Sequence, residues 1–410
     1  MKILLVAEVS IAQVIGGAER VLREQALGLA ARGHSVHILT RMPANDTEER
    51  VDVEGVAEYR YPVIRSNPVS FFLSSMRNAR RACLALAHES LPDVMLIHQP
   101  LSGLAVSGCL PGVPSVYTCL SLAHEEFETR NSPPAGMGGL MWHRCQSLAR
   151  RKIEQRMLNR AQRVIVLSDF MRRRVADCHQ VPSDRILLFP AGVDTQFFSP
   201  ILDYRSARAA LGLTHEDFVL FTVRNLVPRM GLKSLLDAMP AVRKEIPQIR
   251  LLIGGSGPLR AELEAQVKSL ALGDCVRLLG FVPEAQLPAH YRAADLFVLP
   301  TAHIEGFGLV TIEALASGTP VLGTPIGATS EILGGLDASL LTGGADAESL
   351  AAGIAALYRR FAADPGGRAR LSEAGRALVL RAYTWGRHCE QVEAALQQVC
   401  AGAHALPRNG

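Results

Sequence analysis

Short apolar runs, each followed by a loop and a helical pattern, recur along this sequence and constrain its fold more than any other feature. The first run, KILLVAE, predicts a buried strand, and the loop after it ends at Gly16 and Gly17. The helix predicted from about Ala18 has apolar residues at helical spacing and stops at Gly33, before the strand SVHILT. Strands that are apolar on both faces are typical of parallel sheets covered by helices on either side.

The same pattern continues in two series. Further strands are predicted at DVMLIH, PSVYT, RVIVLS and RILLFP, and a second series at DFVLFTV, RLLIGG, CVRLLG, DLFVLP and TPVLGT. Residues 190–214 between the series are rich in Pro and Gly and contain no predicted strand. The sequence therefore predicts an α/β protein of two facing doubly wound Rossmann-like domains, with ligands in the cleft at the carboxyl ends of the strands.

Composition excludes several other classes. Hydrophobic residues make up 48% of the 410 residues, but no apolar run reaches the roughly 18 residues of a membrane-spanning helix. The N-terminal apolar run is a better strand than signal peptide, so we expect a cytoplasmic protein. The eight cysteines form no C-x-x-C pair, which favours buried free thiols over disulfides or a metal site. The loop SIAQVIGGAER lacks G-x-G-x-x-G, which argues against a dehydrogenase.

The basic residues are unevenly placed. Residues 1–195 hold 23 Lys and Arg against 19 Asp and Glu, whereas the remainder is balanced. Most of the excess lies between Arg144 and Arg174. A basic helix surface usually serves only solvation, but together with Phe71 and Phe72 this stretch suggests an anionic membrane surface or a phosphorylated acceptor.

The stretch from Glu305 to Glu313, EGFGLVTIE, carries the most chemical information. It follows the strand DLFVLP and places two carboxylates eight positions apart around two glycines. A glycine loop that opens a helix presents free backbone N–H groups to an anion. We expect Glu313 about two turns into that helix, where it can accept hydrogen bonds from a ribose. Such a pair alone is more often structural than functional.

The wider segment ADLFVLPTAHIEGFGLVTIEALASGTPVLGTPIGATSEIL resembles the donor site of the retaining glycosyltransferases of GT-B architecture, family 4, glycosyl transferases group 1. Supporting motifs run through nearly the whole chain in the family's order: GGAER, PAGVDTQFFSP, RNLVPRMGLKSLLDAM, GGSGPLRAELE, LLGFVPEAQLPAHYRAADLFVLP and YTWGRH. The resemblance implies an acceptor-binding domain over residues 1–195 and a nucleotide-sugar donor-binding domain over residues 196–385. It also implies that residues 386–410, a helix and tail, pack back on the N-terminal domain.

The resemblance also implies roles for residues of the donor domain. Glu305 would lie close to the transferred sugar, Glu313 would bind the ribose, and Arg224 would stabilise the diphosphate as the donor bond breaks, since fixed cations stabilise a departing anion. Backbone groups of the loop would meet sugar hydroxyls and the diphosphate: Phe307, Gly308, Leu309 and Val310. The loop at Gly254 would border the nucleotide pocket, and Val282 would lie by the base.

Two residues of the N-terminal domain complete the predicted site. Gly17 belongs to the loop that the resemblance places against the acceptor and the donor phosphates. His124 matches a histidine that relatives place near the reacting sugar, although here it follows its strand at a greater distance. A satisfied structural histidine is the alternative for His124, and His98 is a poorer candidate.

The sequence departs from the family at one position. The family commonly has a lysine six residues after the arginine, where this chain has Met230 followed by Gly231. Arg229 or Lys233 is expected to substitute for the missing cation. If neither does, a catalytically inactive relative becomes the better interpretation.

We therefore expect a retaining, metal-independent hexosyltransferase. Its donor would be a UDP- or GDP-linked sugar, which is a substrate, so no cofactor is expected. The acceptor would be a glycan, a lipid-linked or a small molecule, nucleic acid is not an expected partner, and the protein would be peripheral on the inner face of the membrane if the basic surface binds lipid. A nucleotide-sugar epimerase or hydrolase and an inactive nucleotide-sugar-binding relative remain the alternatives.

Overall fold

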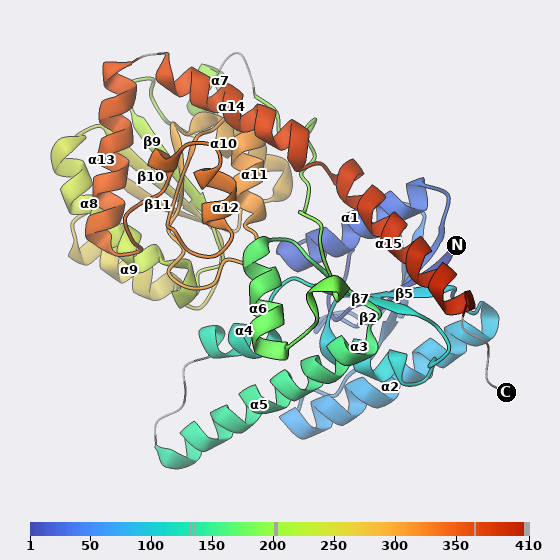
Figure 1. Ribbon diagram of the computed structural model, residues 1–410. Coiled ribbons are helices and arrows are strands. Elements are labelled where there is room, and N and C mark those ends of the chain that lie inside the picture. Colours follow the sequence, from blue (N-terminus) through green and yellow to red (C-terminus); the bar gives the residue numbers. More distant parts are fainter. Residues whose placement is uncertain (132, 134–135, 201–203, 365, 406–410) are drawn as a thin grey trace. The chain divides into compact units, whose positions relative to one another are not determined.

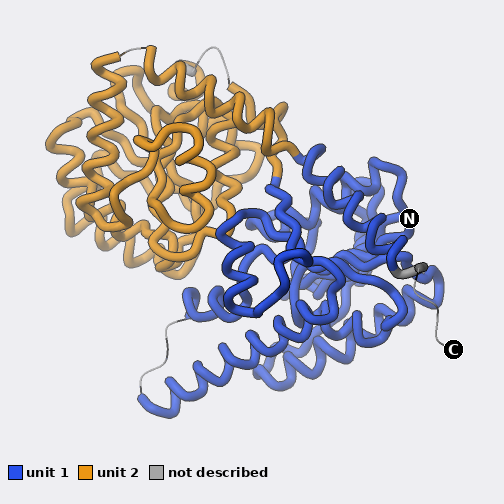
Figure 2. Tube along the Cα trace, in the orientation of Figure 1, with its two compact units in different colours: residues 1–191, 385–410 blue, residues 192–384 orange. Residues whose placement is uncertain are grey.

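A computed structural model describes the chain except for residues 132, 134–135, 201–203, 365 and 406–410 (Figure 1). It divides into two compact units (Figure 2): unit 1 comprises residues 1–191 and 385–410, and unit 2 comprises residues 192–384. The predicted boundary after residue 195 lies close to the observed one. The two predicted α/β Rossmann-like domains are confirmed.

Unit 1 is built on one eight-stranded sheet with the order β3-β4-β2-β1-β5-β6-β7-β8. Its strands are β1 (Lys2–Val6), β2 (Ser35–Arg41), β3 (Arg50–Val53), β4 (Val56–Tyr61), β5 (Val94–Ile97), β6 (Ser115–Cys119), β7 (Arg163–Val166) and β8 (Ile186–Leu188). All neighbouring pairs are parallel except β3 and β4. This antiparallel edge hairpin is absent from the sequence prediction. It turns at Glu54 and Gly55, both with positive φ (53° and 85°).

Helices cover both faces of this sheet. They are α1 (Gly17–Ala31), α2 (Pro68–Glu89), α3 (Pro100–Ser107), α4 (Ala123–Arg130), α5 (Met137–Arg160), α6 (Asp169–His179) and α15 (Trp385–Ala405). One face packs against α1 and α15 through residues such as Leu22 and Leu396, and the other against α2, α3, α5 and α6. Helix α15 therefore packs on unit 1, beside α1 (Figure 1).

Unit 2 has a five-stranded, fully parallel sheet with the order β11-β10-β9-β12-β13. Its strands are β9 (Phe218–Val223), β10 (Ile249–Gly254), β11 (Val276–Gly280), β12 (Leu296–Leu299) and β13 (Val321–Gly323). Its helices are α7 (Tyr204–Ala210), α8 (Leu232–Glu245), α9 (Arg260–Ser269), α10 (Leu287–Ala293), α11 (Leu309–Ala316), α12 (Thr329–Gly334), α13 (Ala347–Ala363) and α14 (Gly367–Ala382). The strand order reverses between β9 and β12, and a ligand site is expected at such a point.

Two further sequence expectations concern thiols and membrane spans. All eight cysteines are free, but the predicted burial holds for only four of them; three are partly buried and Cys145 is exposed. Among the described residues, no helix combines the length and the apolar character needed to cross a bilayer.

Candidate active site

The centre of the site is a buried ion pair at the carboxyl edge of the sheet of unit 2. Arg224 directly follows β9, and Glu305 lies in the loop after the neighbouring strand β12. Only 8% of Arg224 and 7% of Glu305 is exposed. Arg224 Nη2 donates to Glu305 Oε2, and Thr301 Oγ1 donates to the same oxygen at 3.0 Å. The structure thus brings together a cation and a carboxylate that are far apart in sequence.

Two glycines from neighbouring loops pack directly against the backbone of Arg224 and Glu305. A Cβ on Gly255 (φ +125°) would meet the carbonyl oxygen of Arg224 at 1.8 Å. Likewise, a Cβ on Gly327 (φ +61°) would meet the carbonyl oxygen of Glu305 at 2.2 Å, and that oxygen accepts the N–H of Ala328 at 2.9 Å. Glycine at both positions lets neighbouring loops pack directly on the backbone of the ion pair.

The glycine loop after Glu305 leads directly into α11, as predicted. Gly308 (φ +86°) precedes the helix, and Leu309 and Val310 are its first residues, where backbone N–H groups have no intrahelical acceptor. The side chain of Phe307 is buried and its ring packs edge-on against that of Tyr383 at 5.8 Å. The loop therefore presents backbone groups rather than the Phe307 ring.

Glu313 lies nearer the start of α11 than the sequence prediction held. The helix begins at Leu309, so Glu313 is its fifth residue and just over one turn in, not two, because the glycine loop remains non-helical as far as Gly308, which is left-handed. The residue is 8% exposed, and the Tyr291 hydroxyl donates to its Oε2 at 2.8 Å. Tyr291 is a site neighbour that the sequence analysis missed, and its place within the family motif LLGFVPEAQLPAHYRAADLFVLP was the only signal for it.

The second glycine loop lies beside Arg224. Gly254 ends β10, and its carbonyl accepts the N–H of Arg224 at 3.0 Å. Val282 is buried, and its Cγ2 would lie 2.9 Å from a Cβ on Gly254. The structure therefore places Gly254 and Val282 together, next to the ion pair.

Met230 occupies the place of the missing cation and contacts the ion pair. The residue is 6% exposed, and its Sδ accepts from Arg224 Nη2 at 2.8 Å. Of the two predicted substitutes, Arg229 donates to the carbonyl of Ile304, directly before Glu305, at 3.0 Å. Lys233 is about half exposed and pairs with Glu262 on α9. Arg229 thus borders the Glu305 loop, whereas Lys233 is engaged elsewhere.

The two predicted residues of unit 1 lie at helix starts. Gly17 is the first residue of α1. Gly16 before it has no side chain, so it gives the first backbone N–H groups of the helix no side-chain acceptor. His124 is the second residue of α4 and faces Glu154, with 3.7 Å between His124 Nδ1 and Glu154 Oε2. His179 Nε2 lies 3.1 Å from the same carboxylate oxygen. Neither Glu154 nor His179 was a sequence candidate.

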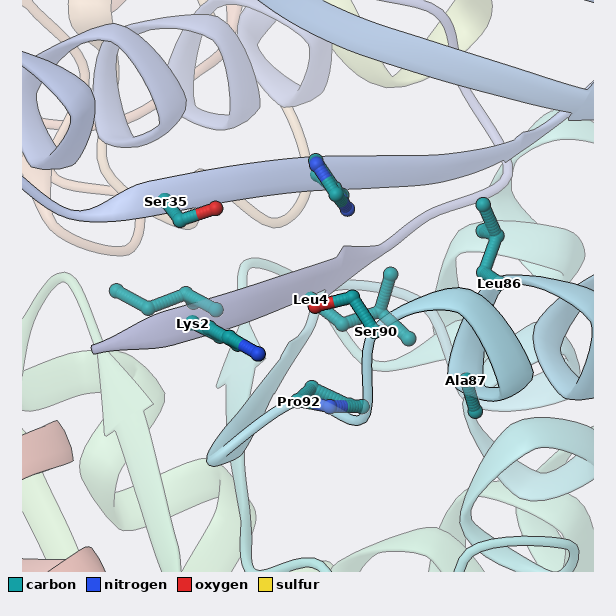
Figure 3. Close-up of a pocket in the computed structure, with 9 residues that line it drawn as sticks. Lys2, Leu4, Ser35, Leu86, Ala87, Ser90 and Pro92 are labelled. Atoms are coloured by element: carbon teal, nitrogen blue, oxygen red, sulfur yellow. The ribbon is translucent and has the colours of Figure 1, made fainter.

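A pocket in unit 1 is lined by none of the predicted site residues. Lys2, Leu4 and Ser35 line it from the beginnings of β1 and β2, with Leu86 and Pro92 beside them (Figure 3). In parallel sheets, ligands bind at the carboxyl ends of strands, the opposite edge. This pocket therefore contributes nothing to the candidate site.

The fold is an α/β fold of GT-B architecture. The solved structure of sucrose-phosphate synthase from Thermosynechococcus elongatus matches 98% of this chain and 100% of its own with a TM-score of 0.79 at 24% identity. WaaG, a glycosyltransferase of lipopolysaccharide biosynthesis, matches 96% of this chain and 99% of its own with a TM-score of 0.71 at 19% identity.

Sequence comparison then gives the family. The "Glycosyltransferase Family 4" profile matches residues 15–197, and "Glycosyl transferases group 1" matches residues 203–378. The D-inositol 3-phosphate glycosyltransferase of Segniliparus rotundus is 30% identical over 76% of this chain and 70% of its own length. A GDP-mannose-dependent α-(1-6)-phosphatidylinositol monomannoside mannosyltransferase of Mycolicibacterium smegmatis is 33% identical over 56% of this chain and 61% of its own. The chain belongs to the group 1 glycosyltransferases, which confirms the resemblance seen in the sequence.

Proposed function

We propose that this glycosyltransferase moves a hexosyl group from a UDP- or GDP-linked donor, bound at the Arg224–Glu305 centre, to its acceptor with retention of anomeric configuration. The observation that carries the proposal is the buried ion pair at the point where the strand order of unit 2 reverses. Breaking the donor bond leaves a nucleoside diphosphate with new negative charge. A guanidinium fixed in a buried site stabilises that charge more than a solvated one would.

The surrounding groups supply the remaining interactions. The first N–H groups of α11 and the positive end of its dipole are suited to phosphate oxygens. Glu313, held by the Tyr291 hydroxyl, is placed to accept hydrogen bonds from ribose hydroxyls. Glu305 would accept from the sugar. These groups can stabilise the leaving diphosphate without a divalent cation, which supports metal-independent transfer.

Retention follows from the side of attack. Glu305 is a hydrogen-bond acceptor already engaged by Arg224 and Thr301, rather than a free nucleophile. The retention that the family resemblance implies, achieved without a covalent glycosyl-enzyme, requires the acceptor to attack on the face from which the diphosphate departs, and we propose this course. Proton NMR of the isolated product decides this point: the donor's anomeric configuration supports the mechanism, and the opposite anomer contradicts it.

The acceptor proposal draws on relatives and on the surface of unit 1. The names of two relatives specify a phosphorylated inositol and a phosphatidylinositol mannoside. Helix α5 combines exposed apolar side chains, among them Met141 and Trp142, with exposed cations such as Arg144 and Lys152. We propose a glycan, lipid-linked or phosphorylated small-molecule acceptor, and a peripheral association of the chain with anionic membrane at the cytoplasmic side.

Nucleotide binding gives the direct test. A ligand that binds only the folded state raises stability by RT ln(1 + [L]/Kd), about 2.7 kcal/mol at a hundredfold excess over Kd. We expect a thermal shift with UDP or GDP rather than with ADP, lost in Glu313→Ala and kept in Glu262→Ala, whose exposed carboxylate lies on α9. The absence of any shift with folded protein would contradict the proposal.

An inactive nucleotide-sugar-binding relative is the second candidate, because Met230 occupies the position of the family lysine. Nucleotide binding without turnover on any acceptor would favour it. An epimerase or hydrolase is distinguished by incubation with donor alone, because those enzymes need no acceptor.

A further inference from the structure

Two histidines converge on one buried carboxylate oxygen in unit 1, and the three side chains come from three different helices. His124 of α4, Glu154 of α5 and His179 of α6 offer ligand atoms that all lie within 4.8 Å of one another. The helices lie close together in Figure 1. Glu154 Oε2 is 3.1 Å from His179 Nε2 and 3.7 Å from His124 Nδ1. The side chains of Glu154 and His179 are fully buried, and that of His124 is 12% exposed.

The neighbouring amide of Gln155 defines the tautomer of His179. Gln155 Nε2 donates to the backbone carbonyl of His179 and to Asn159 Oδ1, both at 3.0 Å. Its Oε1 is therefore the atom that faces His179 Nδ1, also at 3.0 Å, so Nδ1 carries a proton. In the neutral imidazole, Nε2 then has the lone pair, and it points at a carboxylate oxygen.

A backbone N–H also faces this carboxylate. The N–H of Ala123 reaches both carboxylate oxygens, at 3.1 and 3.2 Å. Among the ion pairs of the described residues, Glu154 has only the two histidines as partners.

A metal ion would satisfy the three ligand atoms of this cluster better than a proton on His179 would. An imidazolium at His179 would complete its contact with Glu154, but His124 Nδ1 is buried and, within the described residues, has no hydrogen-bond partner. A cation between the three atoms satisfies them all. At a Zn–N distance of about 2.0 Å, tetrahedral ligand atoms lie about 3.3 Å apart, between the two separations seen here.

We propose that His124, Glu154 and His179 form a binding site for a divalent transition-metal ion of the Zn²⁺ class. Two imidazoles and one carboxylate are a ligand set that Zn²⁺ uses in proteins. Gln155 accepts from the remaining N–H of His179, the outer contact that orients metal-bound histidines. The ion ties α4 to α5 and α6 and holds His124 with its Nδ1 occupied. The site shares no residue with the donor centre of unit 2, and it is compatible with metal-independent transfer.

Cobalt titration of the metal-free chain tests the site. The exposed thiol of Cys145 is first removed by Cys145→Ser, because a free thiol binds the same ions. We expect one Co²⁺ per chain, with a visible ligand-field spectrum, no thiolate charge-transfer band, and displacement by Zn²⁺. Glu154→Gln and His179→Gln should weaken binding at least tenfold, whereas His88→Gln, an exposed histidine of α2, should leave it unchanged.

The Co²⁺ spectrum of the protein that keeps His124, Glu154 and His179 is a test by itself. It does not depend on how well the cluster variants fold. Failure to bind one equivalent of Co²⁺ or Zn²⁺ at micromolar concentration would overturn the site. Equal binding by folded Glu154→Gln and His179→Gln would also overturn it. No nucleotide is present in the titration, so its outcome is separate from that of the donor-binding test.

Discussion

Burial of the Arg224–Glu305 ion pair costs desolvation free energy, so a role beyond stability is a reasonable explanation for it. Desolvation of two charges offsets much of their attraction, so replacement of such a pair by apolar residues is often neutral for stability. Here Thr301 and Met230 also contact Arg224 Nη2, and the guanidinium Nε is buried without a partner among the described residues. An unsatisfied donor at the carboxyl edge of the sheet is consistent with a site that is completed by an anionic ligand.

Glu305→Gln tests the role of the carboxylate at the residue scale. Glutamine keeps the shape and can still accept from Arg224, so the fold should persist, as measured by circular dichroism. Loss of the charge should lower kcat about 10²- to 10³-fold, the usual effect of removing one transition-state contact, while nucleoside diphosphate binding is kept or tightened. Glu262→Gln on α9 is the control. A kcat within twofold of wild type would exclude Glu305 from the reaction.

Met230→Lys tests whether a second cation is missing. A lysine there lies beside Arg224, so like-charge repulsion should lower the melting temperature of the unliganded protein. In the presence of a bound diphosphate the added charge is favourable, and we expect about tenfold tighter UDP or GDP binding. Lys233→Met should leave the affinity unchanged, because Lys233 pairs with Glu262. If Lys233→Met weakens binding instead, Lys233 rather than Arg229 replaces the family cation. Isothermal titration calorimetry measures the nucleotide affinity of both variants.

At the scale of elements, α15 is tied to α1 by a buried histidine. His388 Nδ1 donates to the carbonyl of Pro190 at 2.9 Å, so in the neutral ring Nε2 accepts from Gln25 Nε2 at 2.9 Å. A second proton would place N–H against N–H. Burial lowers the pKa of His388 to about 4, and burial with the nearby His388 lowers that of His98 to about 3.

This histidine predicts an acid-sensitive attachment of α15. A folded-state pKa of about 4, below the ordinary value of 6.5, means that the stabilisation is complete above pH 6.5 and is lost as the pH falls towards 4. The contribution lost by pH 4 is about 3 kcal/mol. Amide hydrogen exchange of α15 should therefore show a steeper fall in protection for wild type than for His388→Gln, with His88→Gln as control. Parallel pH profiles for wild type and His388→Gln would contradict the assignment.

Some elements were predictable from local sequence and others were not. Apolar runs such as DFVLFTV define β9 because parallel strands are buried on both faces. The β3–β4 hairpin was missed because Glu-Gly is a weaker turn signal than Asn-Gly or Asp-Gly. The depth of Glu313 in its helix was wrong because no residue before Leu309 marks the helix start except a glycine, which also suits a loop. The His124 cluster depends on packing of three helices, and no spacing motif reports it.

At the scale of the whole molecule, the small net charge of +4 hides an uneven distribution. The excess is carried by residues 1–195, and much of it lies on α5. The exposed apolar side chains of this helix include Met137 (89% exposed), Met141 (64%) and Trp142 (51%). Exposed apolar groups next to cations are typical of surfaces that bind anionic membranes, and each cation near such a membrane contributes about 1 kcal/mol.

Vesicle binding tests whether the cations of α5, rather than the net charge of the whole chain, determine membrane association. We expect the protein to co-sediment with vesicles containing phosphatidylglycerol at low salt, to detach as salt is raised, and not to bind phosphatidylcholine alone. The double variant Arg144→Ser, Lys152→Ser should lose about 2 kcal/mol, roughly thirtyfold in partitioning. The matched control, Lys244→Ser with Lys268→Ser, removes two exposed cations from unit 2 and changes net charge equally. Equal losses in the two double variants would mean that net charge, not α5, determines binding; no vesicle binding even at low salt would exclude a membrane-surface role.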